Sequence, residues 1–232
     1  MEQIERNFLI VLLGIPIVEY ILYSFYSVGF IIYAVFIGIV LILMENEMGP
    51  TKEEKVLVFL MIIPICRLAE LFLGFDFFWN TLIFYTLVVC LVAYYAIKFK
   101  IKTKPFIGNP SYLLGIFLVG GLGSMAVKYF LQWEFAGLIV IIPLIAYAEE
   151  IYFRGGFQTL TQEWFGNFSI LLTSFLYAAF SISYGFSFVL IAFFASMIIS
   201  TFYHFKKNLY FTFILNLVFH IVLFLVYPAI FS

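Results

Sequence analysis

Residues 135–154 read FAGLIVIIPLIAYAEEIYFR, and this stretch decides the fold. It is long enough for one bilayer crossing, which takes about 20 predominantly apolar residues. The whole chain shares this character: of its 232 residues 65% are hydrophobic and 11% are charged, whereas soluble domains are about half apolar and one quarter charged. The sequence therefore predicts an all-α integral membrane protein whose chemistry lies in its helices or short loops.

Apolar stretches of similar length follow one another along the chain, and each is compatible with a membrane-spanning helix. They cover residues 7–24, 28–44, 56–74, 79–97, 111–131, 135–154, 167–184, 185–204 and 208–230. We expect a polytopic bundle of eight to nine transmembrane helices, eight if one early stretch is re-entrant. The chain, residues 1–232, is expected to form a single membrane domain.

The charged residues nearly balance, with 12 basic against 13 acidic. Such a chain lacks the positive excess by which proteins bind nucleic acid, so nucleic acid is excluded as its main partner, and membrane lipid is expected instead. Cytoplasmic loops retain Lys and Arg. We therefore expect a cytoplasmic N-terminus, because nine spans place these basic residues on its side: Arg6, Lys52, Lys55, Lys98, Lys100, Lys102, Lys104, Arg154, Lys206 and Lys207.

Two residue types that often carry chemistry are rare here. Cys66 and Cys90 both lie in apolar stretches, so we expect them to pack between helices rather than to form a disulfide framework. Of the two histidines, His204 stands beside Lys206 and Lys207 and is expected in a solvated loop.

Charged residues inside the spans need a reason, since one near mid-helix costs about 2.5–3.5 kcal/mol on insertion scales. Glu19 is expected near the outer interface or hydrogen-bonded to a neighbouring helix. Arg67 and Glu70 are three residues apart, which places them on one helix face as an ion pair. For these three residues we favour a structural role.

The strongest cluster is Glu149, Glu150 and Arg154, within six residues of one apolar stretch. Glu150 and Arg154 have the spacing and order of a favourable helical ion pair. This pairing leaves Glu149 without a local partner, and a half-dry carboxylate that reaches water can act as a general base. A purely structural charge network is the alternative.

Asn216 and His220 are four residues apart in the last span, surrounded by apolar residues. They share one helix face, and two such donors aimed at a common point can stabilise an oxyanion. An interhelical hydrogen-bonded pair is the alternative.

The run 149–155, EEIYFRG, matches the EExxxR motif with its trailing glycine and resembles the CPBP or Abi family. This family contains the CAAX-processing and bacteriocin-processing intramembrane proteases, including type II CAAX prenyl endopeptidases. The resemblance covers about residues 110–230, whereas residues 1–105 carry no motif. The two later family motifs, FxxxH and HxxxN, are degenerate here: Tyr177 and Ser181 occupy the first, and Asn216 and His220 stand in reversed order in the second.

The resemblance implies an intramembrane endopeptidase that cleaves a lipidated, prenylated or membrane-bound peptide near the cytoplasmic face. Glu149 would activate the water, Glu150 and Arg154 would support it, and Asn216 with His220 would stabilise the oxyanion. Ser181 would hold a weakened helper position, because serine cannot take up a proton as imidazole does.

The candidate metal ligands are Glu149, His220 and Glu150, since serine and asparagine are poor zinc ligands. The sequence therefore predicts a weakly bound divalent metal such as zinc, or none.

Three functions remain open at this stage. The first is the endopeptidase, either slow or inactive because of Ser181. The second is a non-catalytic membrane scaffold or immunity protein on the same fold. The third is a small transporter with a proton relay through Glu19, Arg67, Glu70 and Glu149, which leaves EExxxRG unexplained.

Overall fold

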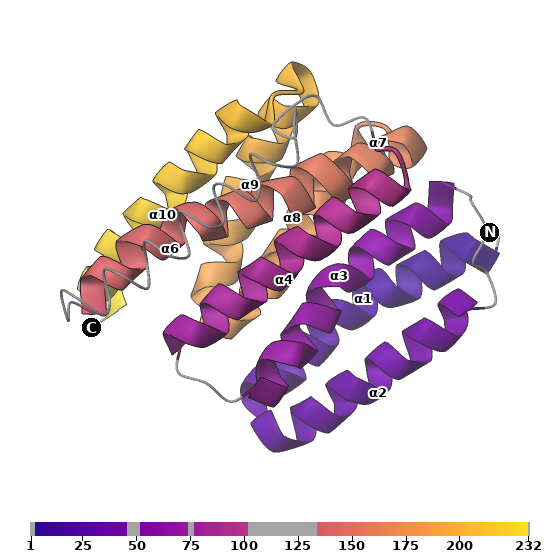
Figure 1. Ribbon diagram of the computed structural model, residues 1–232, viewed down its shortest axis with the longest axis horizontal. Coiled ribbons are helices and arrows are strands. Elements are labelled where there is room, and N and C mark those ends of the chain that lie inside the picture. The colour runs from indigo at the N-terminus through magenta and orange to yellow at the C-terminus, as the bar shows by residue number, and fades with distance from the viewer. Residues whose placement is uncertain (1–2, 46–51, 74–76, 102–133, 232) are drawn as a thin grey trace.

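The computed structural model describes residues 3–45, 52–73, 77–101 and 134–231, and these residues form a bundle of helices (Figure 1). No strand occurs among them. In chain order the elements are α1 (Gln3–Ser24), α2 (Tyr26–Glu45), α3 (Lys52–Leu73), α4 (Phe77–Lys98), α6 (Glu134–Glu149), the π-helix η1 (Glu150–Gln158), α7 (Thr159–Phe165), α8 (Phe168–Phe180), the 3-10 turn η2 (Ser181–Tyr184), α9 (Phe186–Lys206) and α10 (Leu209–Phe231).

The all-α integral membrane character predicted from the sequence is confirmed. Three described segments, Glu5–Ser24, Trp79–Lys98 and Phe188–Lys206, are long and apolar enough to cross a bilayer. Shorter apolar helices cover Tyr26–Ile42, Phe168–Phe180 and Leu209–Leu223. The predicted span 111–131 lies outside the described residues. A total of eight to nine crossings, and the division at residues 105–110, stay predictions.

The helix that carries the deciding stretch continues beyond Arg154. Helix α6, the π-helix η1 and helix α7 follow without a break to Phe165. The residues after Arg154 still face the core, because Phe157 and Gln158 are fully buried and Leu160 nearly so. The predicted span 135–154 therefore lies within a longer continuous helix, and its bounds as a membrane crossing stay a prediction.

All nine residues of η1 are buried. The segment contacts α3, α4, α8, α9 and α10 as well as its two flanking helices, so it forms the centre of the bundle. Two glycines allow this close approach: a Cβ at Gly155 would lie 3.2 Å from Leu209, and one at Gly156 would clash with the Phe59 ring.

Polar contacts at four-residue intervals join η1 and α7 to α9. The Arg154 guanidinium donates to Ser196 Oγ at 2.9 Å, Gln158 donates to the Ser200 carbonyl at 2.8 Å, and the Gln162 amide lies 3.1 Å from His204 Nδ1. Each pair is 42 residues apart. The two helices therefore run parallel along this line in a fixed register.

The contacts between helix ends define one basic end of the bundle. Phe8 packs on Trp164 and Phe165, and the Lys55 ammonium lies 5.9 Å from the centre of the Phe99 ring. The start of α1, the start of α3, the end of α4 and the end of α7 thus meet at one end. The basic residues at these helix ends gather there, in agreement with the predicted charge bias.

Arg154 is fully buried, as expected for a charge inside a span. Two other sequence expectations were wrong in detail. His204 does not lie in a solvated loop but in the last turn of α9, half-buried against Gln162. Cys66 packs in the core as expected, whereas Cys90 is exposed on the helix surface. In both cases the neighbouring helices decide whether the side chain is buried or exposed.

We expect Gly156→Ala to destabilise the protein by about 1–3 kcal/mol, because the new methyl group would overpack the core against the fully buried Phe59 ring. Thermal unfolding in detergent measures the effect. The matched control is Gly38→Ala in α2, where a Cβ meets nothing within 4 Å. Equal melting temperatures for the two variants would contradict the packing seen at η1.

Candidate active site

Glu149 is the last residue of α6, and its carboxylate is the meeting point of three other helices. From α10, Asn216 Nδ2 donates to Oε2 at 3.0 Å and His220 Nε2 lies 2.6 Å from the same oxygen. From α8, the Tyr177 hydroxyl donates to Oε2 at 3.0 Å, and from α4 the Tyr85 hydroxyl donates to Oε1 at 3.3 Å. The sequence predicts no partner for Glu149 within its own helix, and the structure holds its carboxylate by four residues that are distant in the sequence.

The two donors of α10 converge on one point, as their four-residue spacing predicts, but that point is occupied. It is the Glu149 carboxylate rather than an open position for an oxyanion. The second Asn216 N–H has its own acceptor, the Ala146 carbonyl at 3.4 Å. Asn216 is fully buried and His220 is 8% exposed, so both side chains are fixed against α6.

The ion pair of Glu150 with Arg154 is confirmed, with Nη1 and Oε1 2.9 Å apart. The two side chains are 1% and 0% exposed. The guanidinium also lies over the ring of Tyr177, 5.2 Å from its centre, which adds a cation–π contact. Arg154 therefore links the buried glutamate to a ring that itself contacts Glu149.

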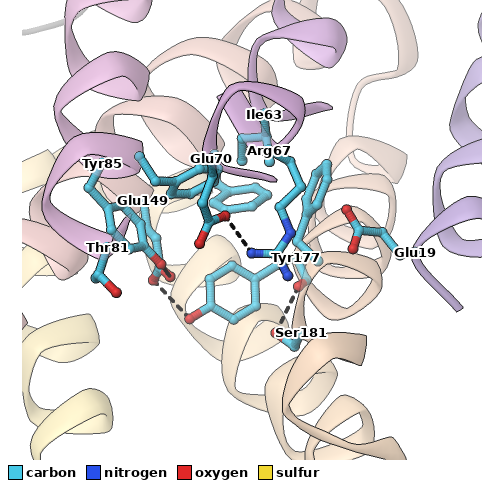
Figure 2. Close-up of a pocket in the computed structure, with 12 residues that line it drawn as sticks. Glu19, Ile63, Arg67, Glu70, Thr81, Tyr85, Glu149, Tyr177 and Ser181 are labelled. Atoms are coloured by element: carbon cyan, nitrogen blue, oxygen red, sulfur yellow. Dashed lines mark hydrogen bonds and ion pairs between the residues drawn. The ribbon is translucent and has the colours of Figure 1, made fainter. Parts of the chain in front are cut away.

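A cavity of about 350 Å³ opens beside Glu149 (Figure 2). Around the carboxylate its wall includes Tyr85, Phe153, Tyr177 and Ser181, whereas Asn216 and His220 lie outside this lining. The Ser181 hydroxyl donates to the Tyr177 carbonyl at 3.0 Å. Ser181 thus shares the cavity with Glu149, and its helper role stays a prediction.

The same cavity contains the charged residues of the early helices. Arg67 and Glu70 of α3 form the predicted ion pair, with 2.6 Å between Nη1 and Oε2. Glu19 of α1 accepts a hydrogen bond from the Tyr33 hydroxyl of α2 at 2.9 Å, which confirms the expected interhelical contact. Figure 2 shows Glu149 at one side of the cavity, Glu19 at the other, and Arg67 between them.

The cavity occupies the half of the bundle away from the basic end. Glu19 and Glu70 lie near the ends of helices that start at the basic end, and Thr81 lies near the start of α4, which finishes there. Glu149 is close to the middle of the continuous helix from Glu134 to Phe165. Its predicted place at the cytoplasmic end of a span stays a prediction.

The residues present do not fit a zinc site. Among the residues that the structure describes, no group of three His, Cys, Asp or Glu side chains converges. Glu149 and His220 approach each other, but Glu150 is engaged with Arg154. Catalytic zinc usually has three protein ligands, so the predicted set Glu149, His220 and Glu150 is one short.

Two contributors to this site were not predicted, the hydroxyls of Tyr85 and Tyr177. Tyr177 carried a signal, because a hydroxyl stands where the family motif has phenylalanine, one helical turn before Ser181. Tyr85 carried none, since 16 tyrosines are spread over the chain and nothing local marks the one that faces Glu149.

One comparison with known proteins found a match, and it covers the segment that contains most of this site. Residues 131–222 match the family model of the type II CAAX prenyl endopeptidases, Rce1-like. This segment holds EExxxRG, Tyr177, Ser181 and the Asn216–His220 pair. The predicted resemblance is confirmed. No curated protein sequence and no solved structure matches the chain.

We expect Arg154→Met to destabilise the protein by about 3–5 kcal/mol, because it leaves the Glu150 carboxylate buried without its partner. The double variant Glu150→Met with Arg154→Met removes both charges and should recover much of the loss. Chemical unfolding in detergent micelles gives both values. The single variants Arg154→Met and Glu150→Met each lose some free energy of unfolding. If the loss in the double variant equals the sum of these two losses, the ion pair is not the interaction that holds η1.

Proposed function

We propose that the protein is an intramembrane endopeptidase of the CPBP type in which Glu149 activates the attacking water. The observation that carries this proposal is the placement of Glu149: its carboxylate borders a cavity and is held there by donors from three helices. A general base must be positioned within hydrogen-bond reach of the water that it deprotonates. A carboxylate fixed at a cavity wall meets this requirement.

The reaction needs one water and one peptide bond. Glu149 accepts a proton from the water while the water oxygen attacks the scissile carbonyl carbon. The tetrahedral intermediate then collapses, the carbon–nitrogen bond breaks, and Glu149 returns the proton to the leaving amine. Such proton transfer by a positioned group contributes about 10²- to 10⁴-fold to the rate.

The other residues of the site support these two steps. Asn216 and His220 already bond Glu149, so we assign them the orientation of the base and not the oxyanion. The hydroxyls of Tyr85 and Tyr177 line the cavity and can rotate toward a developing oxyanion. Glu150 and Arg154 fix η1 and the Tyr177 ring, and Ser181 stands at the remaining helper position.

The substrate class follows from the family and the cavity. CAAX proteases act on membrane-associated prenylated peptides, and we propose a lipidated or membrane-bound peptide here. The gathering of Lys and Arg at one end of the bundle supports the placement of that end in the cytoplasm. If the basic end lies in the cytoplasm, the cavity occupies the half of the bundle toward the opposite side of the membrane. Cleavage near the cytoplasmic face would require the basic end to lie on that opposite side instead. Labelling of single cysteines at the two ends of α4 from either side of a sealed vesicle decides between them.

Glu149→Gln should lower cleavage of a prenylated or hydrophobic peptide by about 10²- to 10⁴-fold, because an amide cannot accept the proton of the water. Cleavage by purified protein in detergent is the measurement. The matched control is Glu163→Gln, the same change at an exposed glutamate of α7, which should cleave like wild type. Equal cleavage by wild type and Glu149→Gln would refute Glu149 as the base.

Restoring the family pattern tests the non-catalytic alternative. The triple change Ser181→His, Asn216→His and His220→Asn should raise the rate by up to about 10²-fold, because it adds an imidazole at the cavity wall. The same peptide assay measures it. Absence of cleavage in both proteins, with an unchanged cellular phenotype for Glu149→Gln, would favour a scaffold or immunity protein on this fold.

A further inference from the structure

The cavity beside Glu149 contains a cation that the proposed chemistry does not use. Arg67, from α3, lines the cavity, and its side chain is 24% exposed. Helix α3 lies outside the segment 131–222 that matches the family model. An arginine inside a membrane bundle is costly and marks an ion or substrate pathway when it faces a cavity.

The guanidinium has the capacity for a second acceptor. It carries five N–H donors in a fixed plane, and its Nη1 bonds the Glu70 carboxylate at 2.6 Å. Figure 2 shows the guanidinium directed into the cavity between Glu70 and Tyr177. The Glu19 carboxylate across the cavity interacts electrostatically with Arg67, accepts its hydrogen bond from the Tyr33 hydroxyl and is 2% exposed.

We propose that Arg67 binds the C-terminal carboxylate of the peptide substrate and so sets where the chain is cut. This inference rests on the proposed function, since it places a peptide across the cavity with its scissile carbonyl at Glu149. Arg67 and Glu149 line the same cavity, so one bound peptide can contact both. Arginine suits the role because its planar fork matches a carboxylate.

The test compares two forms of one prenylated peptide, with a free C-terminal carboxylate and with a C-terminal carboxamide. Binding is measured by fluorescence on the full chain carrying Glu149→Gln, so that cleavage does not interfere. We expect the acid to bind about 10- to 100-fold more tightly than the amide, as a charge-assisted hydrogen bond implies. Adding Arg67→Gln should bring this ratio close to one, and Arg67→Lys should give an intermediate ratio.

Glu70→Gln is the matched control. It removes the carboxylate that occupies Nη1 and leaves Arg67 in place, so the acid-to-amide ratio should rise. This variant also decides the question if Arg67→Gln fails to fold, because an unchanged or lower ratio would then overturn the proposal. A ratio at or below one in the presence of Arg67, or the same ratio with and without it, would overturn it as well.

The two proposals fail separately in these experiments. Cleavage by wild type without a preference for the acid keeps the endopeptidase and overturns the carboxylate subsite. An Arg67-dependent preference without cleavage by wild type keeps the subsite and overturns the endopeptidase. Failure of both peptides to bind overturns the subsite.

Discussion

The ion pair between Glu150 and Arg154 is the constraint on which the rest of the structure depends. Both side chains are out of solvent, and a buried ion pair is tolerated only with good geometry and further hydrogen bonds. Arg154 donates hydrogen bonds to Ser196 on α9, and its guanidinium makes a cation–π contact with the Tyr177 ring on α8. Satisfying one charge therefore fixes three helices, and the contact of Gln158 with Ser200 continues the same register.

Two adjacent glutamates in one helix acquire different environments from this arrangement. Glu150 has a cation as partner and no access to the cavity. Glu149 is held only by hydroxyl, amide and imidazole groups, and it borders a space large enough for a ligand. A carboxylate that is oriented without an arginine partner suits a proton acceptor, so the ion pair supports the chemistry because Arg154 is engaged with the other glutamate.

Much of this could be predicted from local patterns. The helix spans follow from apolar length, and the pairs Glu150–Arg154 and Arg67–Glu70 follow from spacing on one helix, because residues three or four apart are neighbours whatever the surroundings. The partners of Glu149 could not be predicted in the same way. Tyr85 is 64 residues from it and Tyr177 is 28 residues from it, and such contacts depend on how helices pack and rotate. The same reason explains the errors at His204 and Cys90.

The sequence by itself determined that this is a membrane protein built of helices. It also determined that the few charged residues inside its spans mark the candidate site, and that EExxxRG indicates a resemblance to the CPBP family. Only the tertiary structure decided that the charges of the early helices share one cavity with Glu149 of the motif. Periodicity records which side chains lie on one face of a helix, but it contains no information on which faces meet. That information resides in the packing of α3, α4, α8 and α10 around the buried π-helix, and of α1 against α3 and α8.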